Sequence, residues 1–212
     1  MLDLLNIDCI ELMKRYPDKY FDLAITDPPY GNNDAIGVLN GNGHSAKRKD
    51  YKLFENVAPT EEYFTELKRV SKEQIIWGGN WFGLVGGYLC WNKNGTAFGE
   101  AELAYCSMFK SVRVYEYTWN GMLQGNMKDK EQRIHPTQKP VQLYKYLLKE
   151  FAKPNFKILD THLGSGSIAI AVDSVNKIEK MNLTLTASEL DEKHYQNALK
   201  RIEEMTAQTS LF

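Results

Sequence analysis

The chain contains little cysteine, and the positions of its cysteines exclude both a disulfide-stabilised and a zinc-stabilised small protein. Only three of its 212 residues are cysteines, at positions 9, 90 and 106. Because their number is odd and they lie far apart, they form neither a disulfide framework nor the closely paired spacing of a zinc site. We expect three reduced thiols and no metal.

Long apolar runs are also missing. The longest ones, such as residues 168–172 (IAIAV), fall far short of the roughly 20 residues that a membrane-spanning helix needs, and the N-terminus has no secretory pattern. With 43% hydrophobic and 25% charged residues, the composition is typical of one globular domain. The sequence therefore predicts a soluble, cytoplasmic protein without a membrane partner.

The chain has almost no net charge, −1 at neutral pH, which excludes an overall positive field for attracting a polyanion. Any contact with nucleic acid must come from local patches, and two basic segments lie within residues 47–52 and 128–139. Their basic residues are Lys47, Arg48, Lys49 and Lys52 in the first, and Lys128, Lys130, Arg133 and Lys139 in the second. Each patch is also what an ordinary solvated loop would show.

Short apolar segments alternate with helix-like stretches, which predicts an α/β fold with a mostly parallel sheet. One helix should begin after Pro140 and end before Pro154, and another should lie near the C-terminus. Residues 31–56 and 119–138 are expected to be surface loops, neither of them long enough for a separate recognition domain. The expected strands are residues 2–7, 21–26, 74–78, 87–91, 103–109, 156–160 and 182–188.

An acidic turn follows the strand expected at residues 21–26. The sequence continues Asp27-Pro28-Pro29-Tyr30, which places this tetrapeptide at the carboxyl end of a strand, where open α/β sheets bind their ligands. Because the proline rings hold the backbone extended, the Asp27 carboxylate and the Pro28 carbonyl become neighbouring acceptors that suit one NH2 group. The Tyr30 ring offers a face for an unstacked base. Alone, the motif could equally be a plain turn.

A glycine-rich bend follows a second apolar strand, which ends at Asp160. Gly164 and Gly166 flank Ser165 just before a helix of small residues. Glycine at such a turn lets a ligand approach the backbone closely. A later strand ends in Glu189, whose carboxylate is well placed to bind the hydroxyls of a ribose.

The same bend also fits a dinucleotide fingerprint, since Gly164, Gly166 and Ala169 match G-x-G-x-x-A. The rival hypothesis is therefore an NAD-dependent oxidoreductase. Too few residues follow Ala169 for the rest of a dinucleotide fold, and Asp160 would put a negative charge beside a pyrophosphate. S-adenosylmethionine, which carries an ammonium group, a ribose and no phosphate, fits the bend better.

Together these segments resemble the amino-methyltransferases of DNA, in the β-type order in which the catalytic motif precedes the cofactor motif. The resemblance implies a Rossmann-like methyltransferase fold of seven mostly parallel strands with helices on both faces, in a single domain over residues 1–212. Residues 1–118 would form the catalytic part and 139–212 the cofactor-binding part, with 31–56 and 119–138 as recognition loops. The segments that carry it are LNIDCIELM, DPPYG, TELKRVSKEQIIWGGNWF, WNK, HPTQKPVQL, LDTHLGSGSIAIA and SELDEKHYQNALKRI.

The resemblance also implies a role for each motif residue. The amine-binding and base-stacking residues would be Asp27, Pro28, Pro29 and Tyr30; those lining the methionine part of the cofactor would be Asp160, Gly164, Ser165 and Gly166. Glu189 would bind the ribose, and Thr137 and Lys139 would close over the cofactor. Asp8 would contact the cofactor adenine, although an exposed turn aspartate explains it nearly as well. For His135, a plain loop histidine is the preferred interpretation.

One dipeptide departs from the family pattern. Pro-Phe commonly follows the motif aspartate, whereas Thr161 and His162 follow it here. The flat ring of His162 could replace the aromatic side chain, or cofactor affinity could be lower. Three tryptophans could line a base pocket, but large aromatics near strand ends are more typical of a core: Trp77, Trp81 and Trp91.

We therefore predict a site-specific enzyme that moves a methyl group from S-adenosylmethionine to adenine N6 in double-stranded DNA, with the target base flipped out. Aspartate before the prolines favours adenine in this family, and cytosine N4 is the alternative. Two further hypotheses are a methyltransferase of protein glutamine or RNA and a catalytically inactive nucleic-acid binding module. Such protein enzymes usually carry Asn-Pro-Pro-Tyr after the cofactor motif. The family also suggests a homodimer that pools loops from two subunits.

Overall fold

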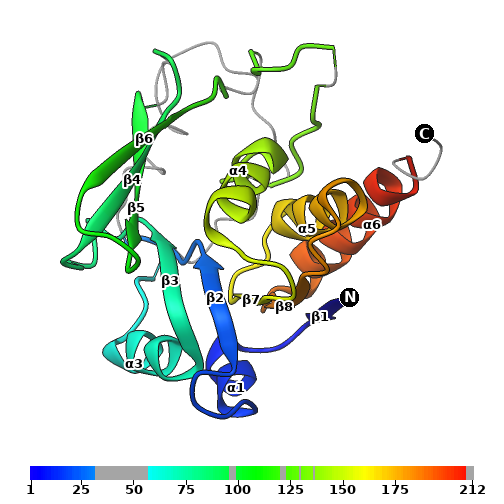
Figure 1. Cartoon of the computed structure of the whole chain (residues 1–212). Helices are drawn as coiled ribbons and strands as arrows, with labels where there is room; N and C mark the ends of the chain where they lie inside the picture. Colours follow the sequence, from blue (N-terminus) through cyan, green and yellow to red (C-terminus); the bar gives the residue numbers. More distant parts are fainter. Residues whose placement is uncertain (32–56, 96–98, 120–122, 129, 136, 209–212) are drawn as a thin grey trace.

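A mixed sheet forms the centre of the molecule, which the computed structural model describes over residues 1–31, 57–95, 99–119, 123–128, 130–135 and 137–208. Its eight strands in these residues are β1 (Leu2–Leu5), β2 (Phe21–Thr26), β3 (Ser71–Trp77), β4 (Gly87–Asn92), β5 (Ala101–Cys106), β6 (Val112–Glu116), β7 (Lys157–Asp160) and β8 (Thr184–Ser188). Their order is β1-β8-β7-β2-β3-β5-β4-β6. All neighbours pair in parallel except β3 with β5 and β4 with β5. Strands β7 and β8 thus lie between β1 and β2 (Figure 1).

The predicted α/β class with a mostly parallel sheet is confirmed, but the predicted count of seven strands is wrong. Each expected strand is present: β2 has the expected bounds, the others have ends shifted by up to three residues, and the additional strand is β6. It lies at the edge of the sheet beside β4. Because Val112 and Val114 are 65% and 58% exposed and Arg113 separates them, these residues lack the buried apolar run that marks the other strands.

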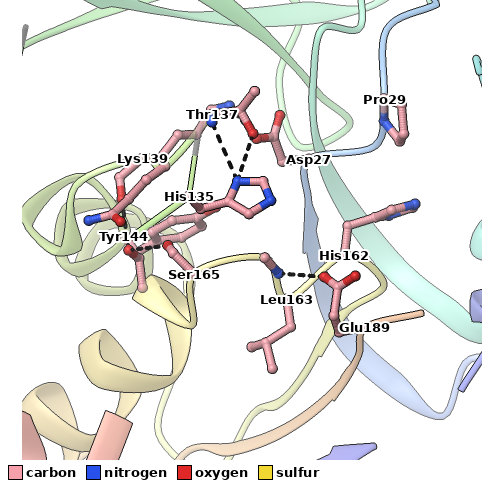
Figure 2. A pocket seen from close by; sticks show the side chains of 13 residues that line it. Asp27, Pro29, His135, Thr137, Lys139, Tyr144, His162, Leu163, Ser165 and Glu189 are labelled. Atoms are coloured by element: carbon pink, nitrogen blue, oxygen red, sulfur yellow. Dashed lines mark hydrogen bonds and ion pairs between the residues drawn. The ribbon is translucent and has the colours of Figure 1, made fainter. Parts of the chain in front are cut away.

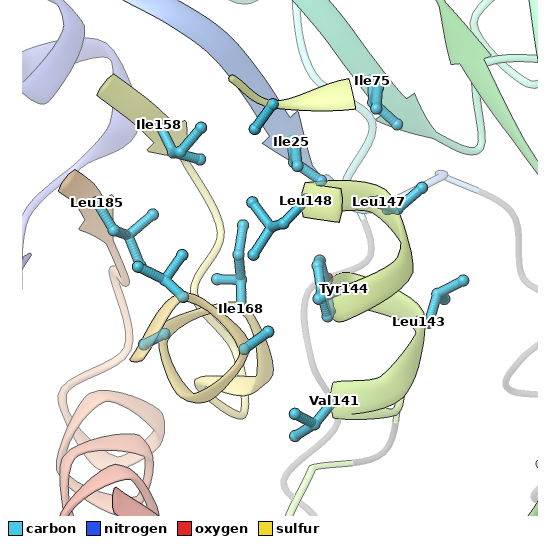
Figure 3. Close-up of a cluster of buried hydrophobic side chains, with 14 of the residues drawn as sticks. Ile25, Ile75, Val141, Leu143, Tyr144, Leu147, Leu148, Ile158, Ile168 and Leu185 are labelled. Atoms are coloured by element: carbon cyan, nitrogen blue, oxygen red, sulfur yellow. The ribbon is translucent and has the colours of Figure 1, made fainter. Parts of the chain in front are cut away.

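Alternating side chains along the central strands divide the core into two layers. In β3, Ile75 and Trp77 belong to one buried cluster and Ile76 to the other. The first cluster is covered by α4 (Val141–Phe151), α5 (Ser167–Glu179) and α6 (Glu192–Gln208), and the second by α1 (Cys9–Lys14) and α3 (Glu61–Val70). Figure 3 shows the first layer, where Leu147 and Leu148 of α4 face the sheet. Helices on both faces are therefore confirmed.

The two helices expected from the sequence both form. Helix α4 begins after Pro140 and ends before Ala152, and its buried stripe includes Tyr144, Leu147 and Leu148. Helix α6 is the expected C-terminal helix. None of the helices in the described residues is long and apolar enough to cross a membrane.

Three parallel strands carry the candidate motifs to one edge of the sheet. Leu23 of β2 pairs with Ile158 of β7, and Asp160 at the end of β7 pairs with Ala187 of β8. The carboxyl ends of adjacent parallel strands lie side by side. The turn at residues 27–30, the bend at 161–166 and Glu189 therefore emerge next to one another.

Candidate active site

The segments that the sequence singled out open into a single cleft. Its lining comes from the turn after β2 (Asp27 and Pro29), the segment before α4, the bend after β7, and Glu189 after β8. Figure 2 shows Asp27 and Thr137 on one side and Leu163 and Glu189 on the other. Residues more than a hundred positions apart in the chain are thus brought within reach of one ligand.

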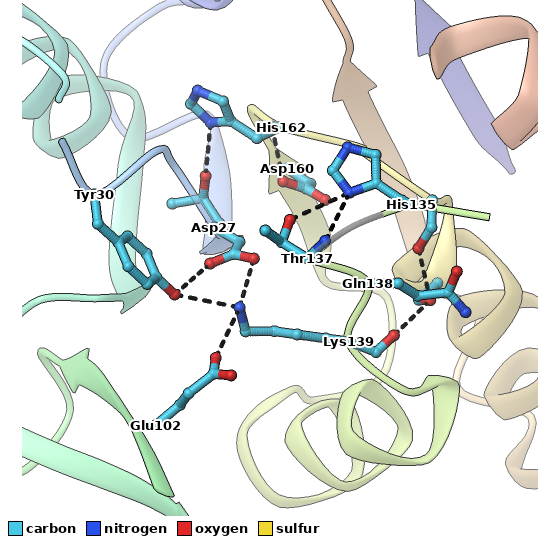
Figure 4. A network of polar contacts seen from close by, with 12 residues as sticks. Asp27, Tyr30, Glu102, His135, Thr137, Gln138, Lys139, Asp160 and His162 are labelled. Carbon is cyan, nitrogen blue, oxygen red and sulfur yellow. Dashed lines mark hydrogen bonds and ion pairs between the residues drawn. The ribbon is translucent and has the colours of Figure 1, made fainter. Parts of the chain in front are cut away.

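The Asp27 carboxylate is held on both of its oxygens. The Tyr30 hydroxyl donates to Oδ1 at 2.8 Å, and the Lys139 ammonium donates to Oδ2 at 2.5 Å (Figure 4). Burial raises the pKa of the Asp27 carboxyl above its ordinary value, while the charge of Lys139 opposes that rise. Pro28, which follows it, is buried, and Pro29 lines the cleft.

The Tyr30 ring rests on a glycine that leaves room for it. Gly78 has φ +69°, and a Cβ added there would lie 2.4 Å from Tyr30 Cε1. Phe82 meets the same ring edge-on, with the ring centroids 6.2 Å apart. Gly78 is therefore required both by its backbone conformation and by the ring beside it.

Lys139 lies on the acceptor side of the cleft, where we had not expected its side chain. Its ammonium contacts Asp27, the Tyr30 hydroxyl at 3.3 Å and Glu102 of β5 at 3.2 Å. Glu102 also pairs with Lys93. Since Lys139 is only 5% exposed, it does not form part of a basic surface patch for DNA, which corrects that interpretation. The patch at 47–52 and the loop at 32–56 lie outside the described residues.

Asp160 is a buried carboxyl group with few polar partners. It is 1% exposed, and its Oδ1 accepts the His162 amide at 3.0 Å. It makes no ion pair with any residue of the described ranges. Burial raises the pKa of Asp160 to about 8, and the negative charges of Asp27 and Glu189 add to the rise. A positively charged ligand would stabilise the ionised form of this group.

The glycine bend has the conformation expected of a ligand loop. Gly164 and Gly166 have φ +54° and +75°, a region that side chains disfavour. The Gly164 amide donates to Glu189 Oε2 at 2.9 Å. Ser165 lines the cleft, whereas Gly166 is the N-cap residue just before α5, and a Cβ there would lie 2.7 Å from Ile202 Cδ1.

His162 presents a neutral ring to the cleft. Its Nδ1 lies 2.9 Å from Thr161 Oγ1 and 3.3 Å from Thr26 Oγ1, and its ring meets Tyr63 edge-on. Burial lowers the pKa of His162 to about 4. A flat, uncharged ring thus occupies the position where the family pattern has an aromatic residue, which is consistent with the proposed replacement.

His135 and Thr137 both lie at the cleft, in the loop before α4, and the side chain of this loop histidine is buried. His135 is 8% exposed, and burial lowers its pKa to about 3. Its ring packs edge-on against His194 of α6, with 4.6 Å between centroids. Thr137 Oγ1 lies 3.2 Å from His135 Nδ1. The side chain is therefore part of the packed wall of the cleft.

Asp8 and the tryptophans lie away from the cleft lining. Asp8 Oδ1 accepts the amides of Ile10 and Glu11, so its carboxylate caps α1. Its charge nevertheless acts on His162. Trp77 and Trp91 are core residues, at 0% and 1% exposure, and Trp81 is 53% exposed.

A buried ion pair that we had not anticipated supports the bend. Arg201 of α6 donates to the Ser165 carbonyl at 2.8 Å and to Glu131 at 2.7 Å. Glu131 in turn accepts the Val141 amide at the start of α4. The pair thus connects the segment before α4 with the bend after β7.

Replacing Arg201 with methionine should lower the free energy of unfolding by about 3–5 kcal/mol, because it leaves the Glu131 carboxylate buried without its partner. Denaturant unfolding followed by circular dichroism measures this change. Adding Glu131→Gln to Arg201→Met should recover part of the loss, since no uncompensated charge remains. A loss below about 1 kcal/mol, the range of exposed pairs, would contradict the structural role.

The chain is similar in sequence to known DNA methylases. The family model of N6/N4 methyltransferases, described as DNA methylase, matches residues 90–178. The type II methyltransferase M.HinfI of Haemophilus influenzae is 25% identical over 251 aligned positions, covering 95% of this chain and 68% of the relative.

Two solved structures share the fold. The M1.HpyAVI–SAM complex superposes with a TM-score of 0.56 at 18% identity, covering 95% of this chain and 100% of the other. The PvuII DNA methyltransferase, named as cytosine-N4-specific, gives 0.59 at 10% identity, covering 98% and 92%. The expected Rossmann-like methyltransferase fold is therefore confirmed.

Proposed function

We propose that this chain transfers a methyl group from S-adenosylmethionine to N6 of adenine in duplex DNA. Its family match and its structural neighbours support a DNA amino-methyltransferase of the N6/N4 type. One observation carries the proposal. The Asp27 turn and the Gly164–Gly166 bend line the same cleft, because β2 and β7 are parallel neighbours. A single carbon could pass between ligands bound at these two segments.

The bend and the strand beside it would offer the hydrogen-bond acceptors that S-adenosylmethionine needs. When bound, the cofactor supplies an electrophilic methyl carbon on its sulfonium. Asp160, buried without an ion pair among the described residues, would hold the ammonium group of the methionine part. Gly164 and Ser165 let the cofactor approach the backbone, and Glu189 would accept hydrogen bonds from the ribose.

The turn after β2 would bind the acceptor. An exocyclic amine is a poor nucleophile because its lone pair is delocalised into the base. Asp27 and the Pro28 carbonyl would accept its two hydrogens, which helps to localise that pair on nitrogen. Tyr30 would stack on a base swung out of the duplex, which offsets part of the unstacking cost. The turn would thus orient the amine nitrogen towards the part of the cleft where bound S-adenosylmethionine would supply the methyl group, and the proton displaced from the amine would pass to solvent.

Two substitutions of Tyr30 separate the contribution of its ring from that of its hydroxyl. Tyr30→Ala should raise the KM for DNA roughly 5- to 150-fold, since stacking contributes about 1–3 kcal/mol per base. Tyr30→Phe keeps the ring and removes only the hydroxyl that contacts Asp27, so we expect a smaller change in KM. Steady-state kinetics on a DNA duplex measures both. Equal KM values for the two variants would contradict stacking.

Transfer of tritium from labelled S-adenosylmethionine tests the proposed reaction. Duplex DNA should be labelled, whereas RNA and protein should not. Digestion to nucleosides then separates N6-methyladenine, which we expect, from N4-methylcytosine. The cytosine alternative has support from the fold shared with the PvuII enzyme, and the label would decide between them. Labelled protein or RNA in place of DNA would overturn the proposal.

Two further parts of the proposal concern partners. Contacts with DNA phosphates would come from surface cations such as Lys128, which is exposed. A homodimer would let two copies contribute recognition loops. Light scattering that finds only monomers during catalysis would contradict the dimer.

We also propose that the protein acts in the cytoplasm.

A further inference from the structure

We propose that Lys139 and Glu102 are positioning residues for the acceptor site, a pair of opposite charges that holds Asp27 as an oriented carboxylate. The inference rests on the proposed function and deepens it. Neither residue would touch the reacting atoms. Both would act through Asp27, with Lys139 in direct contact and Glu102 holding Lys139.

The contacts fix the orientation of each charged group. The Lys139 ammonium lies 2.5 Å from Asp27 Oδ2, 3.2 Å from Glu102 Oε2 and 3.3 Å from the Tyr30 hydroxyl (Figure 4). The other Glu102 oxygen pairs with Lys93. The Lys139 side chain is 4% exposed. Because this ammonium has three donors and three oxygen partners, its position is fully determined.

The main chain of Lys139 joins the two halves of the cleft. Its carbonyl accepts the Ser167 hydroxyl at 2.7 Å, at the first residue of α5. Its side chain reaches the turn after β2. One residue therefore fixes the distance between the helix that follows the cofactor bend and the carboxylate that would bind the amine.

The pair leaves Asp27 able to accept a further hydrogen bond. An ionised carboxylate offers about four lone-pair sites on its two oxygens. Tyr30 uses one on Oδ1 and Lys139 uses one on Oδ2. A protonated carboxyl would instead present a donor hydrogen to the amine. Keeping Asp27 ionised is therefore necessary for its proposed role.

The charges around Asp27 decide its ionisation. Burial raises its pKa, Lys139 lowers it, and Glu102 raises it. Tyr30 on the same turn donates to it, Lys93 neutralises Glu102, and Tyr144 of α4 and Asp160 of β7 also face it. The positive charges of Lys139 and Lys93 thus balance the negative charges of Asp27 and Glu102. Removing either Lys139 or Glu102 should therefore shift the Asp27 pKa, but in opposite directions.

The experiment compares Lys139→Met and Glu102→Gln by two readouts. The first is the dependence of kcat on pH, in which activity requires ionised Asp27 and falls on the acidic side. Lys139→Met should move this acidic limb upward by about 1–3 pH units, the usual effect of losing an adjacent opposite charge. Glu102→Gln should move it downward. Lys149→Met, which breaks an exposed ion pair between α4 and α5, is the matched control and should leave the limb in place.

The second readout does not need methylation. The 13C resonance of the Asp27 carboxyl, assigned with Asp27→Asn, should titrate at higher pH in Lys139→Met and at lower pH in Glu102→Gln. Shifts in the same direction, or reduced kcat at all pH values with unmoved titration, would overturn the inference. If Lys139→Met does not fold, Glu102→Gln alone decides by the sign of its shift. A wild-type protein that titrates as expected but methylates no DNA would instead refute the proposed function.

Discussion

Replacing Asp27 with alanine should lower kcat for methyl transfer by at least about 10²–10³-fold, the usual cost of removing one preorganised electrostatic group. The side chain supplies one of two acceptors for the target amine, and the other, the Pro28 carbonyl, cannot replace it. Binding of S-adenosylmethionine should stay near wild type, because the bend after β7 and Glu189 are unchanged. Single-turnover transfer and calorimetric cofactor binding measure the two effects.

The chemically closest control for that variant is Asp27→Asn. It keeps one acceptor oxygen but loses the charge, and it removes the ion pair with Lys139. We expect it to fall between wild type and alanine. If the alanine variant methylates DNA at the wild-type rate, the acceptor is elsewhere. If it loses cofactor binding as well, Asp27 acts on the cofactor rather than on the base.

Replacing Asp160 with asparagine should weaken S-adenosylmethionine binding roughly 30-fold to several thousand-fold. Removing one partner of a buried charge pair usually costs about 2–5 kcal/mol of binding free energy, which corresponds to this range of affinities. Because Asp160 has a pKa of about 8 in the free protein, it is mostly protonated at pH 7. A bound ammonium group favours its ionised form, so wild-type binding should release a proton. Calorimetry in buffers of different ionisation enthalpy detects this release, and the asparagine variant should show none.

The same substitution should change how stability depends on pH. The folded-state pKa of Asp160 is raised from 3.8 to about 8. A raised pKa contributes stability that is complete below the unfolded value and is lost as pH rises through the folded one. The wild-type Tm should therefore fall between pH 4 and 8 more steeply than that of Asp160→Asn. Parallel Tm curves for the two proteins would show that Asp160 is not buried as a protonated acid.

Local patterns predicted the parts of the site that depend on strand ends. Asp27 and Asp160 follow apolar strands, and parallel neighbours bring such ends together. Pro140 and the apolar spacing after it predicted α4. These signals are contained within ten or fifteen residues, so they can be found without knowledge of the sheet order.

Contacts that depend on the pairing of distant strands were not predictable. Glu102 lies in an ordinary segment, AELAYC, and reaches Lys139 only because β5 pairs antiparallel with β3 and β4. Arg201 is one of several cations on α6, and its burial follows from packing of that helix against the bend. Lys139 resembled a surface cation because it stands near other basic residues, whereas the fold buries it beside two carboxylates.

The position of β7 and β8 between β1 and β2 has a consequence for how the protein is made. On a ribosome the first strand emerges long before β8, its partner, so it must wait unpaired until nearly the whole chain has been synthesised. Such sequence-distant pairings slow folding and prolong exposure of apolar edges to aggregation. The pairing of β2 with β7, which brings the ends that carry Asp27 and Asp160 together, likewise joins segments more than a hundred residues apart, so the cleft can form only late in synthesis.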